Sequence, residues 1–182
     1  MGKLILFCIL SLPIIFISRR SLSSRRNHGF YRFFSWECIL WLLISNYKFW
    51  FENPFSFCQV VSWILLFLSI YYLVAGTILM VKMGKPEKSG EREALFRFEK
   101  TSELIESGIF KYIRHPLYGS LILLTWGVFL KNISWPLFLV SLVSTIFLYI
   151  TALLDEKECL QYFGNKYNEY MKRSKMFVPF LL

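Results

Sequence analysis

Two short polar segments interrupt the apolar second half of this chain, and both carry side chains suited to chemistry. The first, residues 108–118, reads GIFKYIRHPLY. Its Arg114 offers a planar fork of donors that suits a carboxylate. His115 and Pro116 open an expected helix whose free N–H groups and dipole favour an anion. The segment can therefore hold an anionic group, although Arg and Tyr are also common anchors at a membrane surface.

Aromatic and acidic side chains complete the two segments. Tyr112 and Tyr118 add ring faces on which a purine or a cation can lie. The second segment, residues 155–158, reads DEKE. Its acids can bind an amino group or the hydroxyls of a sugar, and the same acids are equally natural on a solvated helix surface. Each segment taken alone has a plain structural explanation.

Taken together, the two segments resemble a family pattern. The stretch LIESGIFKYIRHPLYGS at 104–120 is followed by DEKECLQYFGNKYNEYMKR at 155–173. Two ordered motifs at this separation resemble the membrane methyltransferases that include isoprenylcysteine carboxyl methyltransferase and the phospholipid methyltransferases. The resemblance covers the chain from about residue 102 onward, whereas the N-terminal half matches only in being a set of spans.

The resemblance implies an enzyme that transfers a methyl group from S-adenosylmethionine to a lipid or other lipophilic acceptor at the cytoplasmic membrane face. Arg114 and Glu156 are the catalytic residues that it implies, flanking the cofactor, and no metal ligand is expected. The cofactor-binding residues that it implies are Ser102, Glu103, Leu104, Ile105, Phe110, His115, Pro116, Leu117, Tyr118 and Asp155.

Several positions depart from the family pattern. Ser102 stands in place of a common His, Phe110 in place of Tyr, Asp155 in place of the first Glu, and Cys159 in place of Leu. These changes are compatible with cofactor binding. Thr151 stands where methyltransferases of prenylated cysteine carry an Arg that addresses the substrate, which argues against a prenylcysteine acceptor. A phospholipid amine, a small thiol and other lipophilic nucleophiles stay open as acceptors.

Two other classes of protein compete with this interpretation. An NADPH-dependent sterol reductase would look similar in the C-terminal region, but it would be longer and would need further basic residues for the cofactor phosphates. A non-enzymatic membrane scaffold would explain the apolar runs but not the paired motifs.

Membrane helices are the elements that must position these residues. The 182-residue chain is 55% hydrophobic and 19% aromatic, with a mean hydropathy of +0.47. This composition predicts an all-α polytopic membrane protein of one domain. Glu37, the one acid of the second apolar run, is expected to face a partner helix, to lie near the membrane interface, or to serve the site. The apolar runs predict about five transmembrane helices, at 4–17, 33–49, 57–81, 117–130 and 135–154.

Short links divide the chain further. They predict antiparallel hairpins between the second and third spans and between the fourth and fifth. The single domain, 1–182, then has three N-terminal spans (1–81), a cytoplasmic cofactor loop (82–116), a helical hairpin (117–154), and a C-terminal interfacial helix and tail (155–182).

Charge predicts orientation and partners. The Arg cluster at 19–26, the polar loop and the basic tail must share one side, which is the cytoplasm, so the N-terminus is expected outside. The formal charge of +9 sits next to apolar runs, which indicates anionic lipid and not nucleic acid. Four cysteines without a CxxC pair predict neither a disulfide nor a zinc site. The sequence leaves the oligomeric state open.

Overall fold

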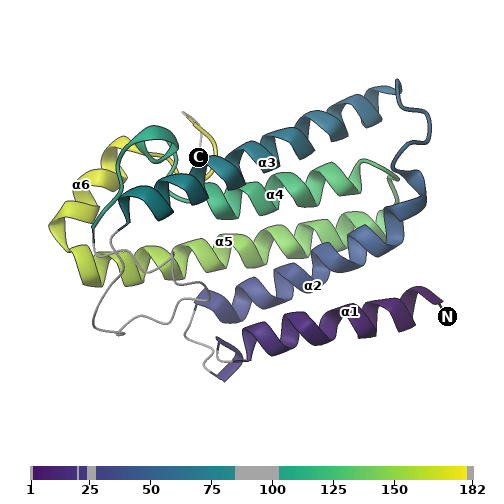
Figure 1. Ribbon diagram of the computed structural model, residues 1–182, viewed down its shortest axis with the longest axis horizontal. Coiled ribbons are helices and arrows are strands. Elements are labelled where there is room, and N and C mark those ends of the chain that lie inside the picture. The colour runs from purple at the N-terminus through teal and green to yellow at the C-terminus, as the bar shows by residue number, and fades with distance from the viewer. Residues whose placement is uncertain (1, 20, 24–27, 85–102, 180–182) are drawn as a thin grey trace.

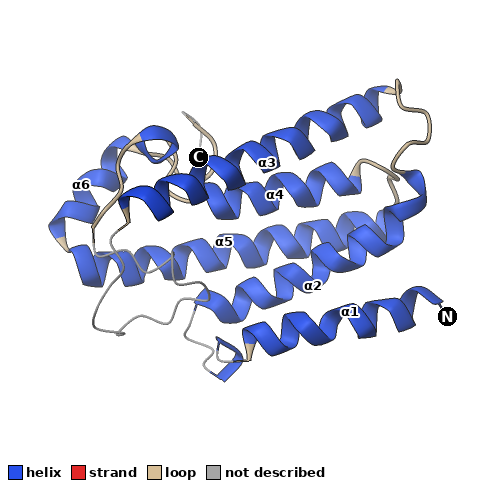
Figure 2. Ribbon diagram, in the orientation of Figure 1, coloured by secondary structure: helices blue, strands red, loops and turns tan. Residues whose placement is uncertain are grey.

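The computed structural model describes residues 2–19, 21–23, 28–84 and 103–179. Within these ranges every regular element is a helix, as predicted, and Figure 2 shows helices joined by loops. The elements are α1 (Gly2–Ser18), η1 (Ser21–Ser23), α2 (His28–Asn46), η2 (Tyr47–Phe49), α3 (Phe57–Met83), η4 (Gly108–Lys111), α4 (Pro116–Phe129), α5 (Trp135–Phe163) and α6 (Asn165–Arg173).

The long helices lie side by side in one bundle, with α6 at the end where α5 finishes (Figure 1). Helix α3 packs mainly against α4, helix α2 packs mainly against α5, and α1 packs against α2. The predicted hairpin of α4 and α5 is confirmed, because these consecutive helices also pack together. The predicted pairing of α2 with α3 is wrong, since α3 packs on α4 and α2 packs on α5.

Small residues explain this packing. A Cβ atom on Gly127 of α4 would lie 3.0 Å from the side chain of Leu66 on α3, and one on Gly76 of α3 would lie 3.2 Å from Pro116. Small side chains let helices approach closely in a membrane. Between α2 and α5, the buried hydroxyls of Ser35 and Ser144 form a hydrogen bond of 2.9 Å. These contacts, and not the order of helices along the chain, select the partners.

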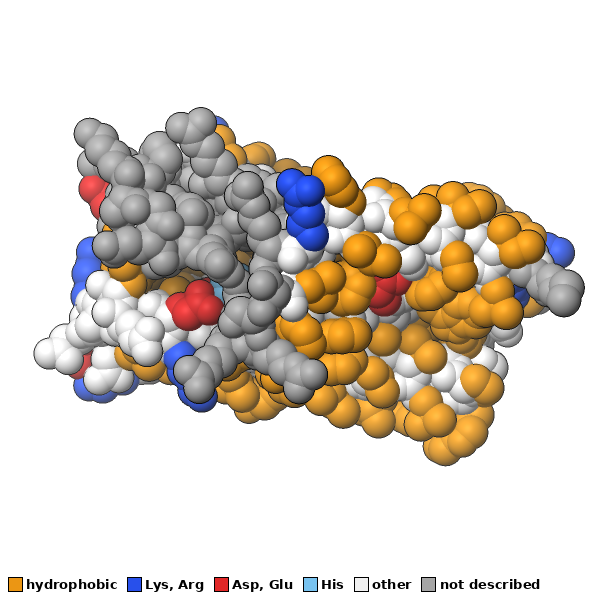
Figure 3. Space-filling view, turned by 90° about the horizontal axis from the view of Figure 1, so that it is seen from below, with side chains coloured by type: hydrophobic (Ala, Val, Ile, Leu, Met, Phe, Trp, Pro, Cys, Tyr) orange, Lys and Arg blue, Asp and Glu red, His pale blue; other side chains and the backbone are white. Residues whose placement is uncertain are grey.

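Among the residues that the structure describes, two helices have the length and composition of membrane spans. These are α3, with 27 residues, and α5, with 29 residues. Helices α1 and α4 are apolar but shorter, with 17 and 14 residues. The outward faces of α1 and α3 expose many large apolar side chains, and hydrophobic groups dominate much of the described surface in Figure 3. Such a surface suits a membrane protein, while the number of about five spans stays a prediction.

Helix α5 is longer than its apolar part. A separate C-terminal helix was expected to begin at residue 155, but α5 continues without a break to Phe163. Neither Pro nor Gly occurs between Leu154 and Phe163, and the helix ends at Gly164, whose φ of 57° suits glycine. The acids of 155–158 therefore stand on the last turns of α5, beyond its apolar stretch.

Buried polar side chains fix the helices elsewhere. Glu37 of α2 accepts a hydrogen bond of 2.6 Å from the Ser11 hydroxyl of α1, so it faces a partner helix. At the opposite end of the bundle from the acids, Lys131 is buried in the link between α4 and α5. Its Nζ lies 3.0 Å from Oε1 of Gln59 and 3.8 Å from the ring centroid of Trp63.

Candidate active site

His115 lies where three parts of the chain meet. It occupies the N-cap position of α4 without a capping hydrogen bond from its side chain, and Pro116 is the first helical residue, as predicted. Its Nδ1 lies 3.5 Å from Oδ2 of Asp155, and its Nε2 lies 3.3 Å from Oε1 of Glu156. The structure thus brings the two polar segments together through a buried imidazole between two carboxylates.

The carboxylates control the charge of this imidazole. Burial lowers the pKa of His115, but its hydrogen bonds with Asp155 and Glu156 outweigh burial, and the net pKa is raised. Burial also disfavours the charged form of Asp155, which raises the pKa of this acid. The hydrogen bond with His115 and the nearby positive charges outweigh burial and bring the pKa of Asp155 down to about 2. Both shifts favour the charged forms, so we describe His115, Asp155, Glu156 and Arg114 as an ion pair network.

Arg114 joins three segments at this cluster. Its Nε donates to Oε1 of Glu156 over 2.8 Å, and one terminal nitrogen donates to the carbonyls of Met171, at 3.3 Å, and Ser174. Two roles were expected for this side chain, a fork for a cofactor carboxylate or a pin between the loop and the acidic helix end. The structure shows the second arrangement, in which Arg114 links the segment before α4 to Glu156 at the end of α5.

The C-terminal tail after α6 runs beside the segment that precedes α4. The backbone N–H groups of Arg114 and His115 donate to the carbonyls of Lys175 and Met176 over 2.7 and 3.1 Å, and the N–H of Lys175 donates to the carbonyl of Tyr112 over 2.9 Å. The tail therefore accepts the N–H of His115 itself, and the expectation that the first N–H groups of α4 favour an anion stays a prediction. The buried hydroxyl of Tyr170 donates to the carbonyl of Phe110 over 2.6 Å and holds α6 in place.

The two tyrosines of the first motif have different environments. The ring of Tyr118 is buried and stacks on His115 with a centroid distance of 5.5 Å. One face of this ring therefore lies against the imidazole, and the stacking of Tyr118 on the cofactor stays a prediction. Tyr112 is exposed and lines a pocket.

The remaining residues predicted to bind the cofactor differ in how deeply they are buried. Leu117, in the first turn of α4, is half-buried. Ser102 lies outside the described residues. Glu103 is exposed, Leu104 is half-buried, and Ile105 and Phe110 are buried. The cofactor-binding roles of all these residues stay predictions.

His28 belongs to the cluster and was missed from the sequence. At the start of α2, its Nδ1 lies 3.0 Å from both carboxylate oxygens of Glu158. The one available signal was the scarcity of histidine, since the chain has two. Potential ligand atoms of His28, Asp155 and Glu158 lie within 4.8 Å of one another. His28 already pairs with Glu158, and the positive charge of Arg32 acts on the same group of side chains, so an ion pair explains the cluster without a metal.

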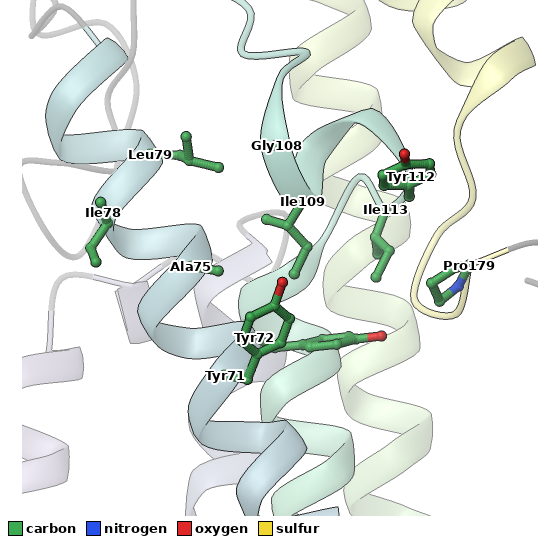
Figure 4. A pocket seen from close by; sticks show the side chains of 10 residues that line it. All are labelled: Tyr71, Tyr72, Ala75, Ile78, Leu79, Gly108, Ile109, Tyr112, Ile113 and Pro179. Atoms are coloured by element: carbon green, nitrogen blue, oxygen red, sulfur yellow. The ribbon is translucent and has the colours of Figure 1, made fainter.

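A pocket of about 560 Å³ lies between α3 and the segment 108–113, which directly precedes Arg114 and His115 in the chain (Figure 4). Tyr72, Ala75 and Leu79 of α3 form one wall, and Ile109 and Ile113 form the other. In Figure 4 the side chains of Ile109 and Ile113 extend toward the ring of Tyr72. Such a volume falls in the range of roughly 300–1,000 Å³ that small-molecule sites occupy.

The helical bundle and this site agree with the comparison to known families. Residues 65–166, more than half of the chain, match the family model described as phospholipid methyltransferase. The protein therefore belongs to the phospholipid methyltransferase family. The matched range runs from within α3 into α6 and contains every residue that was predicted for the site.

Individual relatives cover a smaller part of the chain. Methanethiol S-methyltransferase 1 of Bradyrhizobium diazoefficiens is 30% identical over 71 residues, which are 39% of this chain and 24% of the relative. Methanethiol S-methyltransferases of Pseudomonas deceptionensis and Crocosphaera subtropica are 33% and 31% identical over 73 and 72 residues, 40% of this chain and 27% and 28% of the relatives. The matched part spans about a quarter of the length of these relatives. No solved structure matches the chain significantly.

Proposed function

We propose that this protein transfers a methyl group from S-adenosylmethionine to a lipophilic acceptor at the cytoplasmic face of the membrane. The observation that carries the proposal is the buried His115 between Asp155 and Glu156, inside the range that matches a methyltransferase family. Bound S-adenosylmethionine supplies a methyl group already activated by a sulfonium, so the protein has mainly to bind, orient and exclude water.

The acids differ in their suitability for the cofactor. The side chain of Asp155 is 28% exposed, whereas that of Glu156 is 8% exposed and bonded to Arg114 and His115. Asp155 is negatively charged and accessible, which fits an amino group or ribose hydroxyls. We assign cofactor contact to Asp155, and we assign Glu156 and Arg114 to positioning the start of α4 against α5.

A proton must leave the acceptor when a thiol or a protonated amine is methylated. Glu158 and Glu156 are the two candidate bases on this helix face. Glu158 is 31% exposed and pairs with His28, whereas Glu156 is 8% exposed and pairs with both Arg114 and His115. Glu158 is therefore the better placed of the two to receive the proton.

The acceptor is the least constrained part of the proposal. Thr151, one turn before Asp155, is buried and donates to the carbonyl of Phe147 in its own helix over 2.7 Å. It offers no charge to a carboxylate substrate, which supports an acceptor other than prenylcysteine. The relatives are named for a thiol, methanethiol, so we favour a lipophilic thiol over a phospholipid amine.

The arrangement of the helices supports one domain with a cytoplasmic site. Helix α6 and the end of α5 lie at the same end of the bundle in Figure 1. Lys166, Lys172 and Arg173 belong to α6 at that end, and basic residues favour the cytoplasmic side. The N-terminus of α1 lies at the other end (Figure 1) and is proposed to face outside. Fusing a reporter to each terminus tests this, and two reporters on one side would refute it.

Calorimetry on the detergent-solubilised protein tests the function. S-adenosylhomocysteine, the product of methyl donation, is expected to bind, and NADPH is not. Binding of NADPH alone would indicate the sterol reductase class instead. Binding of neither compound to folded protein would leave the scaffold interpretation.

A further inference from the structure

The pocket between α3 and segment 108–113 has an apolar lining. Apart from backbone, its polar groups are the hydroxyls of Tyr71, Tyr72 and Tyr112, and the described lining includes no charged side chain. A phosphate or an ammonium group placed in such a lining would lose its hydration without gaining a partner. The lining is therefore suited to hydrocarbon and to at most a neutral polar group.

The pocket connects the apolar surface to the start of α4. Tyr71 and Ile78, on its outer rim, are exposed on the outward face of α3. Ile113, at its inner end, is 1% exposed and directly precedes Arg114 and His115 in the chain. A molecule in the bilayer can enter from the rim and reach the neighbourhood of the ion pair network.

Close packing of α3 keeps the pocket next to that network. A Cβ atom on Gly76 would lie 3.2 Å from Pro116, and one on Gly119 would lie 3.2 Å from the ring of Tyr72. The α3 wall is thus in contact with the first turn of α4, the turn that begins at His115. The inner end of the pocket is fixed relative to the proposed cofactor site.

The volume sets the size of the occupant. Methanethiol has two non-hydrogen atoms, which would fill on the order of 60 Å³ if each takes the roughly 30 Å³ of a water molecule. A pocket of about 560 Å³ would then be nearly empty. An unbranched chain of many carbon atoms fills it, and its neutral head can meet the tyrosine hydroxyls or the start of α4.

We infer that this pocket binds the hydrocarbon chain of the methyl acceptor, and that the acceptor is a neutral single-chain lipophile, of the class of long-chain thiols. This inference rests on the proposed function and narrows its substrate class. It distinguishes the acceptor both from methanethiol itself and from a phospholipid amine, whose charged head has no partner in the described lining.

Photolabelling of the full-length protein in phosphatidylcholine nanodiscs tests the site. The probe is a long-chain alkanethiol that carries a diazirine in mid-chain, and labelled residues are located by mass spectrometry. Labelling is expected on Ile109 or Ile113, with protection by excess 1-decanethiol and none by phosphatidylethanolamine. Equal protection by the two competitors, or labelling confined to the outward face of α3, would overturn the inference.

A pair of neighbouring variants provides the control. Ala75→Trp fills the pocket, whereas Val74→Trp adds the same ring at the adjacent, exposed residue, which does not line the pocket. Ala75→Trp is expected to reduce labelling of Ile109 and Ile113 about tenfold, equivalent to roughly 1.4 kcal/mol, and Val74→Trp is expected to leave it unchanged. Equal labelling in both variants contradicts the inference. Should Ala75→Trp fail to fold, Ile109→Trp fills the pocket from the other wall, with Ile113 as the labelled residue.

Calorimetry with S-adenosylhomocysteine on the same samples separates the two proposals. If the wild type binds it and the pocket is not labelled, the acceptor inference is wrong and the proposed function stands. If the pocket is labelled and no S-adenosylhomocysteine binds, the proposed function is wrong, and the pocket is a lipid site without a role in methyl transfer.

Discussion

The guanidinium Nε of Arg114 donates to Oε1 of Glu156 over 2.8 Å, and this bond joins the segment before α4 to the end of α5. The two side chains are 10% and 8% exposed, so the pair is nearly removed from water. A buried charge that loses its partner is strongly destabilising. The bond therefore holds the site together in addition to any part it has in catalysis.

Replacing Arg114 with Lys is expected to destabilise the protein by about 2 kcal/mol or more, because Lys keeps the charge but cannot bond Glu156 and the tail carbonyls together. Thermal unfolding in detergent measures this. Arg173→Lys is the control, since Arg173 is 62% exposed and pairs with Glu106 at the surface; its change is expected within about 0.5 kcal/mol. Equal melting temperatures for the two variants would mean that Arg114 only anchors the chain at the interface.

Replacing Asp155 with Asn is expected to weaken binding of S-adenosylhomocysteine by more than about tenfold, roughly 1.4 kcal/mol, since a charge-assisted hydrogen bond is lost. Calorimetry measures the affinity. Glu169→Gln, which changes an exposed acid that pairs with Lys172, is expected to bind like the wild type. Unchanged affinity in a folded Asp155→Asn variant would remove Asp155 from the cofactor site.

The ionisation of His115 predicts a pH dependence. Its pKa in the folded protein is raised above the ordinary 6.5, so the charged imidazole stabilises the fold below about pH 6.5, and this contribution is lost as the pH rises through the folded pKa. The stability of the wild type relative to His115→Gln should therefore be larger at pH 6 than at pH 9. Denaturant unfolding of both proteins at each pH measures the difference in their free energies of unfolding. Ionisable groups that titrate alike in both proteins cancel in this difference. A difference independent of pH would show that the pKa of His115 is the same in the folded and unfolded states, and a difference that grows with pH would show that the folded pKa is lowered.

Lys131 is expected to stabilise the far end of the bundle. Its ammonium contacts Gln59 and the ring of Trp63, and replacing it with Met removes the hydrogen bond and the cation–π contact, at a cost of about 1–2 kcal/mol. Thermal unfolding of Lys131→Met measures this. Lys48→Met, at an exposed residue near the same end, is the matched control and is expected to change little. Similar stability of both variants would contradict a structural role for Lys131.

The positions of the helices were largely predictable from the sequence. The apolar runs at 57–81 and 117–130 correspond to α3 and α4, and Pro116 marks the start of α4. Helix formation depends on local hydrogen bonds and on apolar runs, which are properties of contiguous residues. The two motifs also identified the residues that meet at His115, since their types and order carry the family resemblance.

The partners of each helix were decided by the tertiary structure. In a bilayer the lipid-facing and protein-facing sides of a helix are both apolar, so hydrophobicity does not reveal which helix packs against which. Contacts at Gly76 and Gly127 place α3 on α4, and the hydroxyls of Ser35 and Ser144 join α2 to α5. No pattern in one segment predicts such a match between distant residues.

At the site, too, the sequence identified some of the residues and the tertiary structure decided their contacts. The two ordered motifs and the family resemblance that they carry indicated that Arg114, His115, Asp155 and Glu156 belong together. Only the tertiary structure showed that the tail accepts the N–H of His115 and that His28 of α2 holds Glu158. The tail bonds through backbone groups, which every residue other than proline carries in full, and the His28 contact joins residues 130 positions apart. Neither interaction leaves a signal in the local sequence, because each depends on how the folded helices are placed.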